Sequence, residues 1–122
     1  MNRALKAVGA LLIIGVGVVH LEQYFDFMIK DVPTVGTLFL LNSFGAGAIC
    51  VMLAGRFTLV PALAGIGLSL GALVSILLAR YADSGIFNYR EPTWRAPIII
   101  AVALEVVAVV VLGLLAVRRK AA

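Results

Sequence analysis

The sequence predicts an all-α integral membrane protein built as an antiparallel bundle of four transmembrane helices. Apolar residues make up 63% of the 122 residues and charged residues 13%, and the mean hydropathy is +1.13. A helix that crosses a bilayer needs roughly 20 mostly apolar residues. Four segments meet this requirement, at about 4–24, 34–54, 59–80 and 96–117. They use most of the chain, so we expect one transmembrane domain over residues 1–122 and no soluble domain.

Helices fit these segments better than the strands of a membrane barrel. Barrel strands alternate apolar and polar residues, whereas residues 96–104 and 106–117 are apolar on nearly every side. Backbone groups in lipid must bond within the chain, and a helix achieves this within a single segment.

The first segment begins like a secretory signal peptide, with a basic start before an apolar run. No small-residue cleavage site follows the run, so we expect this helix to be retained. It ends in VVHLEQYFDF, where the only histidine, His20, lies two residues before Glu22. On a helix these two side chains point to nearly opposite sides, so they are not a local catalytic pair. We expect His20 to face the bundle with Gly17, and Glu22 to reach water or lipid headgroups.

The second and third segments carry small residues at the spacing that lets helices approach closely in lipid. In the second segment these are Ser43 and Gly47, and in the third they are Gly65, Gly67 and Gly71. We interpret them as packing positions, in the bundle or at the seam of a homo-oligomer. The only cysteine, Cys50, can form no internal disulfide and does not indicate a redox compartment.

The fourth segment contains Glu105, the only charged residue between positions 96 and 117. Nine residues of helix place it roughly 13 to 14 Å below the surface at a rise of about 1.5 Å per residue, near the middle of a core about 30 Å thick. Asn42 is expected at a similar depth and is the candidate partner. Ser69 is also expected near mid-membrane, with His20 and Arg80 above.

Two interpretations of these five residues stay open. Glu105 and Asn42 either bond to fix helix packing, or the group forms a site for a ligand, a lipid or a proton. Ionisable groups inside a membrane are functional candidates by default.

The distribution of basic residues predicts the orientation of the bundle. One side carries basic residues and no acid: Arg3, Lys6, Arg56, Arg118, Arg119 and Lys120. The opposite side mixes both signs of charge. We therefore expect an inner (plasma) membrane protein with both termini in the cytoplasm. The net charge of +4 then reflects topology and the attraction of anionic lipid, and does not indicate nucleic-acid binding.

The longest connection, YADSGIFNYREPTWR at residues 81–95, carries several large side chains, among them Phe87, Tyr89 and Trp94. A fully solvated loop carries fewer of them. We expect the segment to fold back onto the outer face or to cap the bundle above His20. The alternative is an aromatic belt in the headgroup layer without specific docking.

VGVVHLEQY, followed by VPTVGTLFLLNSFGAGAICVML, resembles the small four-helix membrane proteins common in actinobacteria. The shared features are the histidine-leucine pair that ends the first helix and the G-x-LFLL opening of the second. More distantly, the size and helix count are similar to DoxX-like proteins, and this likeness implies architecture only.

The sequence leaves three functions to consider. No CxxC, HExxH or phosphate loop is present in the sequence, so we expect no catalytic residues and no metal site, and no cofactor is indicated. The leading expectation is a non-enzymatic accessory subunit that interacts with membrane lipids and with other membrane subunits or itself. The alternatives are a small transporter or hydrophobic-ligand-binding protein that uses Glu105, and a quinone- or redox-linked enzyme.

Overall fold

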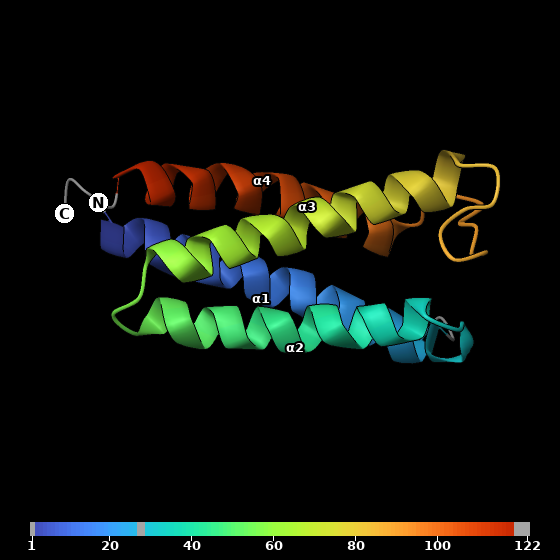
Figure 1. Cartoon of the computed structure of the whole chain (residues 1–122), viewed down its shortest axis with the longest axis horizontal. Helices are drawn as coiled ribbons and strands as arrows, with labels where there is room; N and C mark the ends of the chain where they lie inside the picture. The colour runs from blue at the N-terminus through green and yellow to red at the C-terminus, as the bar shows by residue number, and fades with distance from the viewer. Residues whose placement is uncertain (1, 27–28, 119–122) are drawn as a thin grey trace.

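Over the described residues the protein folds into four long helices, as the sequence predicts. The structure is a computed structural model that describes residues 2–26 and 29–118, so Arg119 and Lys120 lie outside the described residues. Its helices are α1 (Asn2–Asp26), α2 (Val35–Ala54), α3 (Leu59–Tyr81) and α4 (Ala96–Arg118), with a short 3-10 helix, η1 (Ile29–Asp31), before α2 (Figure 1). All four α-helices are long and apolar enough to cross a membrane. The coarse prediction of an all-helical membrane protein is thereby supported.

The ends of the helices follow from local sequence. Pro61 and Pro97 each lie in the first turn of a helix, where a missing backbone donor costs little. The start of α2 passes close to η1 at Gly36. A Cβ atom at this position would lie only 2.7 Å from the carbonyl oxygen of Ile29. Glycine therefore lets η1 pack directly on the first turn of α2.

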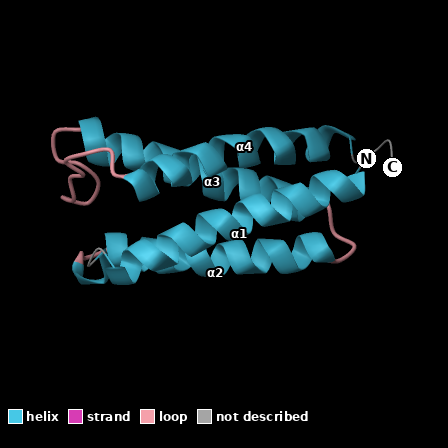
Figure 2. Ribbon diagram, turned by 180° about the vertical axis from the view of Figure 1, so that it is seen from behind, coloured by secondary structure: helices cyan, strands magenta, loops and turns pink. Residues whose placement is uncertain are grey.

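Contacts between distant residues define the two ends of the bundle. At the first, Nδ2 of Asn2 donates to the carbonyl oxygen of Arg118 over 3.3 Å, and Nζ of Lys6 donates to that of Gly55 over 2.8 Å. We call this the termini end. The other, the loop end, holds η1 and the connection over residues 82–95 (Figure 2). Toward the loop end, the pair α1–α2 separates from the pair α3–α4 (Figures 1 and 2).

The core is closely packed around Leu112 of α4. A Cβ atom added at Gly65 would lie 2.4 Å from a methyl carbon of Leu112, and one added at Gly9 would lie 2.6 Å from the other. Between α1 and α2, a Cβ atom at Gly17 would lie 2.7 Å from that of Ala46. Oγ of Ser43 donates to the carbonyl oxygen of Gly17 over 2.8 Å, so Gly65 and Ser43 do lie at helix contacts.

Three of the expected packing glycines do not lie at a helix contact within the chain, and a seam between copies of the chain stays a prediction for them. A Cβ atom at Gly47, Gly67 or Gly71 would meet no neighbouring atom within 4 Å. The small-xxx-small spacing is therefore not sufficient to identify a contact, because the crossing of the helices decides which face meets a neighbour. The outer surface carries large apolar side chains such as Leu11, Phe44 and Val51, which suits a lipid environment.

Candidate ligand-binding site

A pocket of about 380 Å³ lies where the two helix pairs separate. All four helices and the 82–95 connection contribute to its wall, which is mainly apolar. Polar side chains in the wall include His20 of α1, Asn42 of α2 and Glu105 of α4. Gly67 and Gly71 of α3 form part of the wall, so two of the glycines without a packing contact leave room for the pocket. We call this cavity the loop-end pocket.

Glu105 is buried, with 1% of its surface exposed, and it lies close to the imidazole of His20. Oε2 of Glu105 lies 4.0 Å from Nε2 of His20, which is too far for a direct hydrogen bond. Within the described part of the chain, no hydrogen bond to the Glu105 carboxyl is found. Glu105 therefore lacks a hydrogen-bonded protein partner among the described residues.

His20 is held in place by its other ring nitrogen. Nδ1 lies 2.8 Å from the carbonyl oxygen of Val16, and a carbonyl only accepts, so Nδ1 carries the hydrogen of the neutral ring. The imidazole also lies against Phe39 of α2, with ring centroids 4.9 Å apart. Nε2, the ring nitrogen 4.0 Å from Glu105, therefore carries the lone pair of the neutral ring.

Asn42 lines the same pocket, but the expected bond between Asn42 and Glu105 does not form. Oδ1 of Asn42 is buried and has no hydrogen-bond partner among the described residues. The structural interpretation of this pair, a hydrogen bond that fixes helix packing, therefore has no contact to support it.

Ser69 and Arg80 do not join the pocket. Ser69 is fully buried elsewhere in α3, and its hydroxyl has no bonded partner in residues 2–26 and 29–118. Arg80 does not reach down to Glu105. Its guanidinium lies over the rings of Tyr81 and Trp94, and it donates to the carbonyl oxygen of Glu91 over 3.1 Å.

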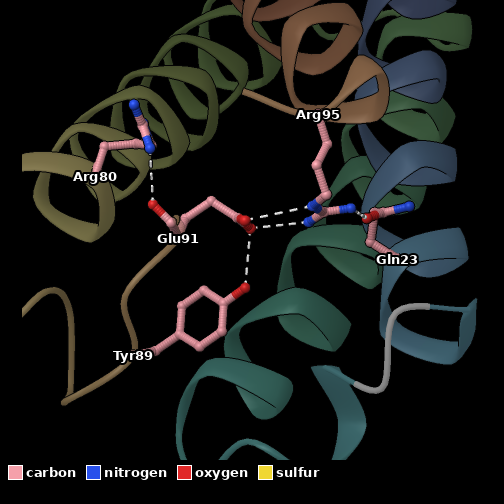
Figure 3. A network of polar contacts seen from close by, with 5 residues as sticks. All are labelled: Gln23, Arg80, Tyr89, Glu91 and Arg95. Atoms are coloured by element: carbon pink, nitrogen blue, oxygen red, sulfur yellow. Dashed lines mark hydrogen bonds and ion pairs between the residues drawn. The ribbon is translucent and has the colours of Figure 1, made fainter. Parts of the chain in front are cut away.

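Figure 3 shows a polar network at the loop end of the bundle, and four of its residues also line the pocket: Gln23, Tyr89, Glu91 and Arg95. Glu91 is buried, and its carboxylate accepts from Arg95 over 2.9 and 3.3 Å and from the Tyr89 hydroxyl over 2.9 Å. Arg95 also donates to Oε1 of Gln23 in α1. Together these contacts tie the connection to α1 and to the start of α4.

The network makes the Tyr89 hydroxyl less acidic. Burial, and then the hydrogen bond and negative charge of Glu91, raise the pKa of Tyr89 from 10.0 to about 12. The neutral phenol is therefore the form that the folded connection stabilises.

The connection covers the pocket with fewer aromatic residues than expected. Ile86, Tyr89 and Glu91 line the pocket together with His20. Phe87 instead has 60% of its surface exposed. Trp94 packs beside Tyr81 and donates to its hydroxyl over 3.2 Å, so neither Phe87 nor Trp94 takes part in the cover.

Sequence reasoning did not select Gln23, Glu91 or Arg95 as pocket residues. Gln23 lies three residues after His20 on α1, and this spacing places both on one helix face. Glu91 and Arg95 lack such a signal, because the path of an irregular connection decides where they meet.

Comparisons with protein-family models, curated proteins and solved structures find no match to this chain. Within the described residues, no three His, Cys, Asp or Glu side chains are grouped so that they could hold a metal ion.

Proposed function

We propose that the protein is a membrane-embedded binding protein for a small hydrophobic molecule, which enters the loop-end pocket from the lipid. The observation that carries this proposal is the pocket itself. Its volume of about 380 Å³ falls within the range of about 300 to 1,000 Å³ usual for small-molecule sites. Such sites combine an apolar wall with a few placed polar groups, and here the polar side chains in the wall include His20, Asn42 and Glu105.

The burial of Glu105 supports binding over a purely structural role. An acid at mid-membrane costs about 2.5 to 3.5 kcal/mol on insertion scales. A bonded partner within the bundle offsets such a cost, yet the described residues supply none at hydrogen-bond distance to Glu105. A ligand in the pocket supplies that partner.

We further propose that the four helices form an antiparallel bundle in the inner membrane with both termini in the cytoplasm. The contact of Asn2 with Arg118 supports a shared end for the first and last helices. The basic residues Arg3, Lys6 and Arg56 lie towards this end, and basic residues accumulate in cytoplasmic loops. Reporter fusions at each terminus test the orientation, and a terminus reported outside contradicts it.

Binding is tested with a pair of glycine variants. Gly71 lines the pocket and Gly47 does not, and a Cβ atom at either position meets no atom within 4 Å. We expect Gly71→Leu to fill the pocket and abolish saturable binding of a fluorescent hydrophobic probe to protein in nanodiscs. Gly47→Leu is the control and should bind as the unmodified protein does.

Two results would contradict binding in this pocket. One is the absence of saturable probe binding to the unmodified protein over empty nanodiscs. The other is equal binding by Gly71→Leu and Gly47→Leu, since only the first variant alters the pocket.

A further inference from the structure

We propose that the ligand is a lipophilic primary amine, whose ammonium group lies among His20, Asn42 and Glu105 while its apolar body fills the rest of the loop-end pocket. This inference rests on the proposed binding function and specifies the ligand class. The ligand class depends on which atoms of the pocket donate hydrogen bonds and which accept them.

Three acceptors in the pocket have no donor from the described protein. Nδ1 of His20 carries the ring hydrogen because it faces the carbonyl oxygen of Val16, so Nε2 presents a lone pair. Oδ1 of Asn42 has no hydrogen-bond partner within residues 2–26 and 29–118. The Glu105 carboxyl carries at least one acceptor oxygen in either protonation state.

The spacing of two of these acceptors fits one bridging nitrogen. Nε2 of His20 and Oε2 of Glu105 are 4.0 Å apart. A nitrogen about 2.9 Å from each atom, the usual length of such a bond, fits between them. Asn42 lines the same pocket and offers the third acceptor.

An ammonium group matches these acceptors better than other headgroups do. It has three donors and no acceptor, as the lysine side chain shows. An alcohol has a single donor, a quaternary ammonium has none, and a carboxylate adds a second negative charge. The ammonium also supplies the opposite charge that a buried carboxylate requires.

The remaining wall fits an apolar body. Leu68 and Ile76 of α3 and Ile98 and Val102 of α4 line the pocket. Burial of methylene groups from water favours binding, but an alkyl chain already dissolved in lipid gains little from it. Selectivity must therefore come from the polar end of the ligand.

The test compares headgroups on one alkyl chain. Decylamine, decanol and decyltrimethylammonium are titrated by calorimetry into protein in phosphatidylcholine nanodiscs, and the signal of empty nanodiscs is subtracted. We expect decylamine to bind at least about tenfold more tightly than the other two, since a hydrogen bond to a charged group contributes about 1.5 to 3 kcal/mol.

Two variants assign the effect to the pocket. Glu105→Gln keeps the shape of the side chain and removes its charge, and we expect roughly tenfold weaker decylamine binding. Asn42→Leu removes the third acceptor and should also weaken the binding of decylamine. Glu22→Gln is the control, because Glu22 is exposed on α1 and outside the pocket, and it should leave binding unchanged.

The outcomes separate this inference from the proposed function. Equal binding of decylamine and decyltrimethylammonium, or of decylamine and decanol, overturns the amine assignment. Decylamine binding that survives Glu105→Gln and Asn42→Leu unchanged also overturns it. It is also possible to separate the two by the probe. If none of the three ligands binds, while the fluorescent probe binds the unmodified protein and not Gly71→Leu, the ligand class is wrong and the binding function stands. If the probe also fails to bind, the binding function is wrong.

Discussion

Nε2 of His20 in α1 faces Oε2 of Glu105 in α4 across 4.0 Å, and no hydrogen bond joins them. The two polar groups are close enough to share a bound atom and too far apart to satisfy each other. A buried acid in this arrangement reduces stability in the absence of a ligand, as binding sites commonly do.

Replacing Glu105 should therefore stabilise the unliganded protein. We expect Glu105→Gln to raise the free energy of unfolding by about 1 to 2 kcal/mol, a part of the roughly 2.5 to 3.5 kcal/mol cost of a mid-membrane acid. Thermal unfolding in mild detergent measures the change. Glu22→Gln, at an exposed position, should change stability by less than about 0.5 kcal/mol. A loss of stability in Glu105→Gln would show that Glu105 has a stabilising partner.

Glu91 should hold the connection over the pocket. Its buried carboxylate bonds both Tyr89 and Arg95, so Glu91→Ala leaves the Arg95 guanidinium without this acceptor. Removing one partner of a buried ion pair lowers the free energy of unfolding by about 3 to 5 kcal/mol. Because Arg95 is partly exposed, we expect Glu91→Ala to lower it by about 2 kcal/mol.

Hydrogen exchange checks this expectation. Residues 82–95 should exchange faster in Glu91→Ala than in the unmodified protein. Asp83→Ala is the matched control, because Asp83 is an exposed acid in the same connection. Equal exchange in both variants would show that Glu91 does not hold the connection.

Alkaline pH should loosen the same connection through Tyr89. The pKa of Tyr89 rises from 10.0 in the unfolded chain to about 12 in the fold, so the folded state binds more protons between these values. The stabilising contribution of Tyr89 is therefore complete below pH 10.0 and is lost as the pH rises to about 12.

Ultraviolet absorbance of tyrosinate follows this titration. The difference between the unmodified protein and Tyr89→Phe isolates Tyr89 from the other tyrosines. In Glu91→Gln, the Tyr89 transition should move to lower pH, because the charge of Glu91 helps to raise the pKa. A transition that stays in place would contradict the role assigned to Glu91.

Alanine substitutions at two glycines of α3 should change the stability of the protein in opposite directions. At Gly65, the new Cβ atom meets a methyl carbon of the buried Leu112 at 2.4 Å, and Ile13 and Ile49 lie close on the same side. Overpacking of this kind costs about 1 to 3 kcal/mol. At Gly67, the new atom meets nothing within 4 Å, and alanine in a helix gains up to about 1 kcal/mol over glycine. Thermal unfolding compares the two variants, and equal changes would contradict the packing described.

The sequence alone determined the helices of this protein and the presence of a buried polar group. Hydropathy and segment length are local properties, because each helix satisfies its own backbone in lipid. They predicted four spans whose bounds lie within a few residues of those in the structure. The isolated position of Glu105 in α4 also predicted its burial, which the structure gives as 1% exposure.

Only the tertiary structure decided which groups meet. Gly65 and Gly67 both follow a small-residue spacing, yet only Gly65 lies against Leu112, since the crossing angle of the helices selects one face. The packing of α1 against α4 placed His20 4.0 Å from Glu105, and Oδ1 of Asn42 has no hydrogen-bond partner among the described residues. The path of the irregular connection joined Glu91 to Arg95 and Arg95 to Gln23. These contacts depend on distances between segments remote in the chain, and no local periodicity encodes such distances.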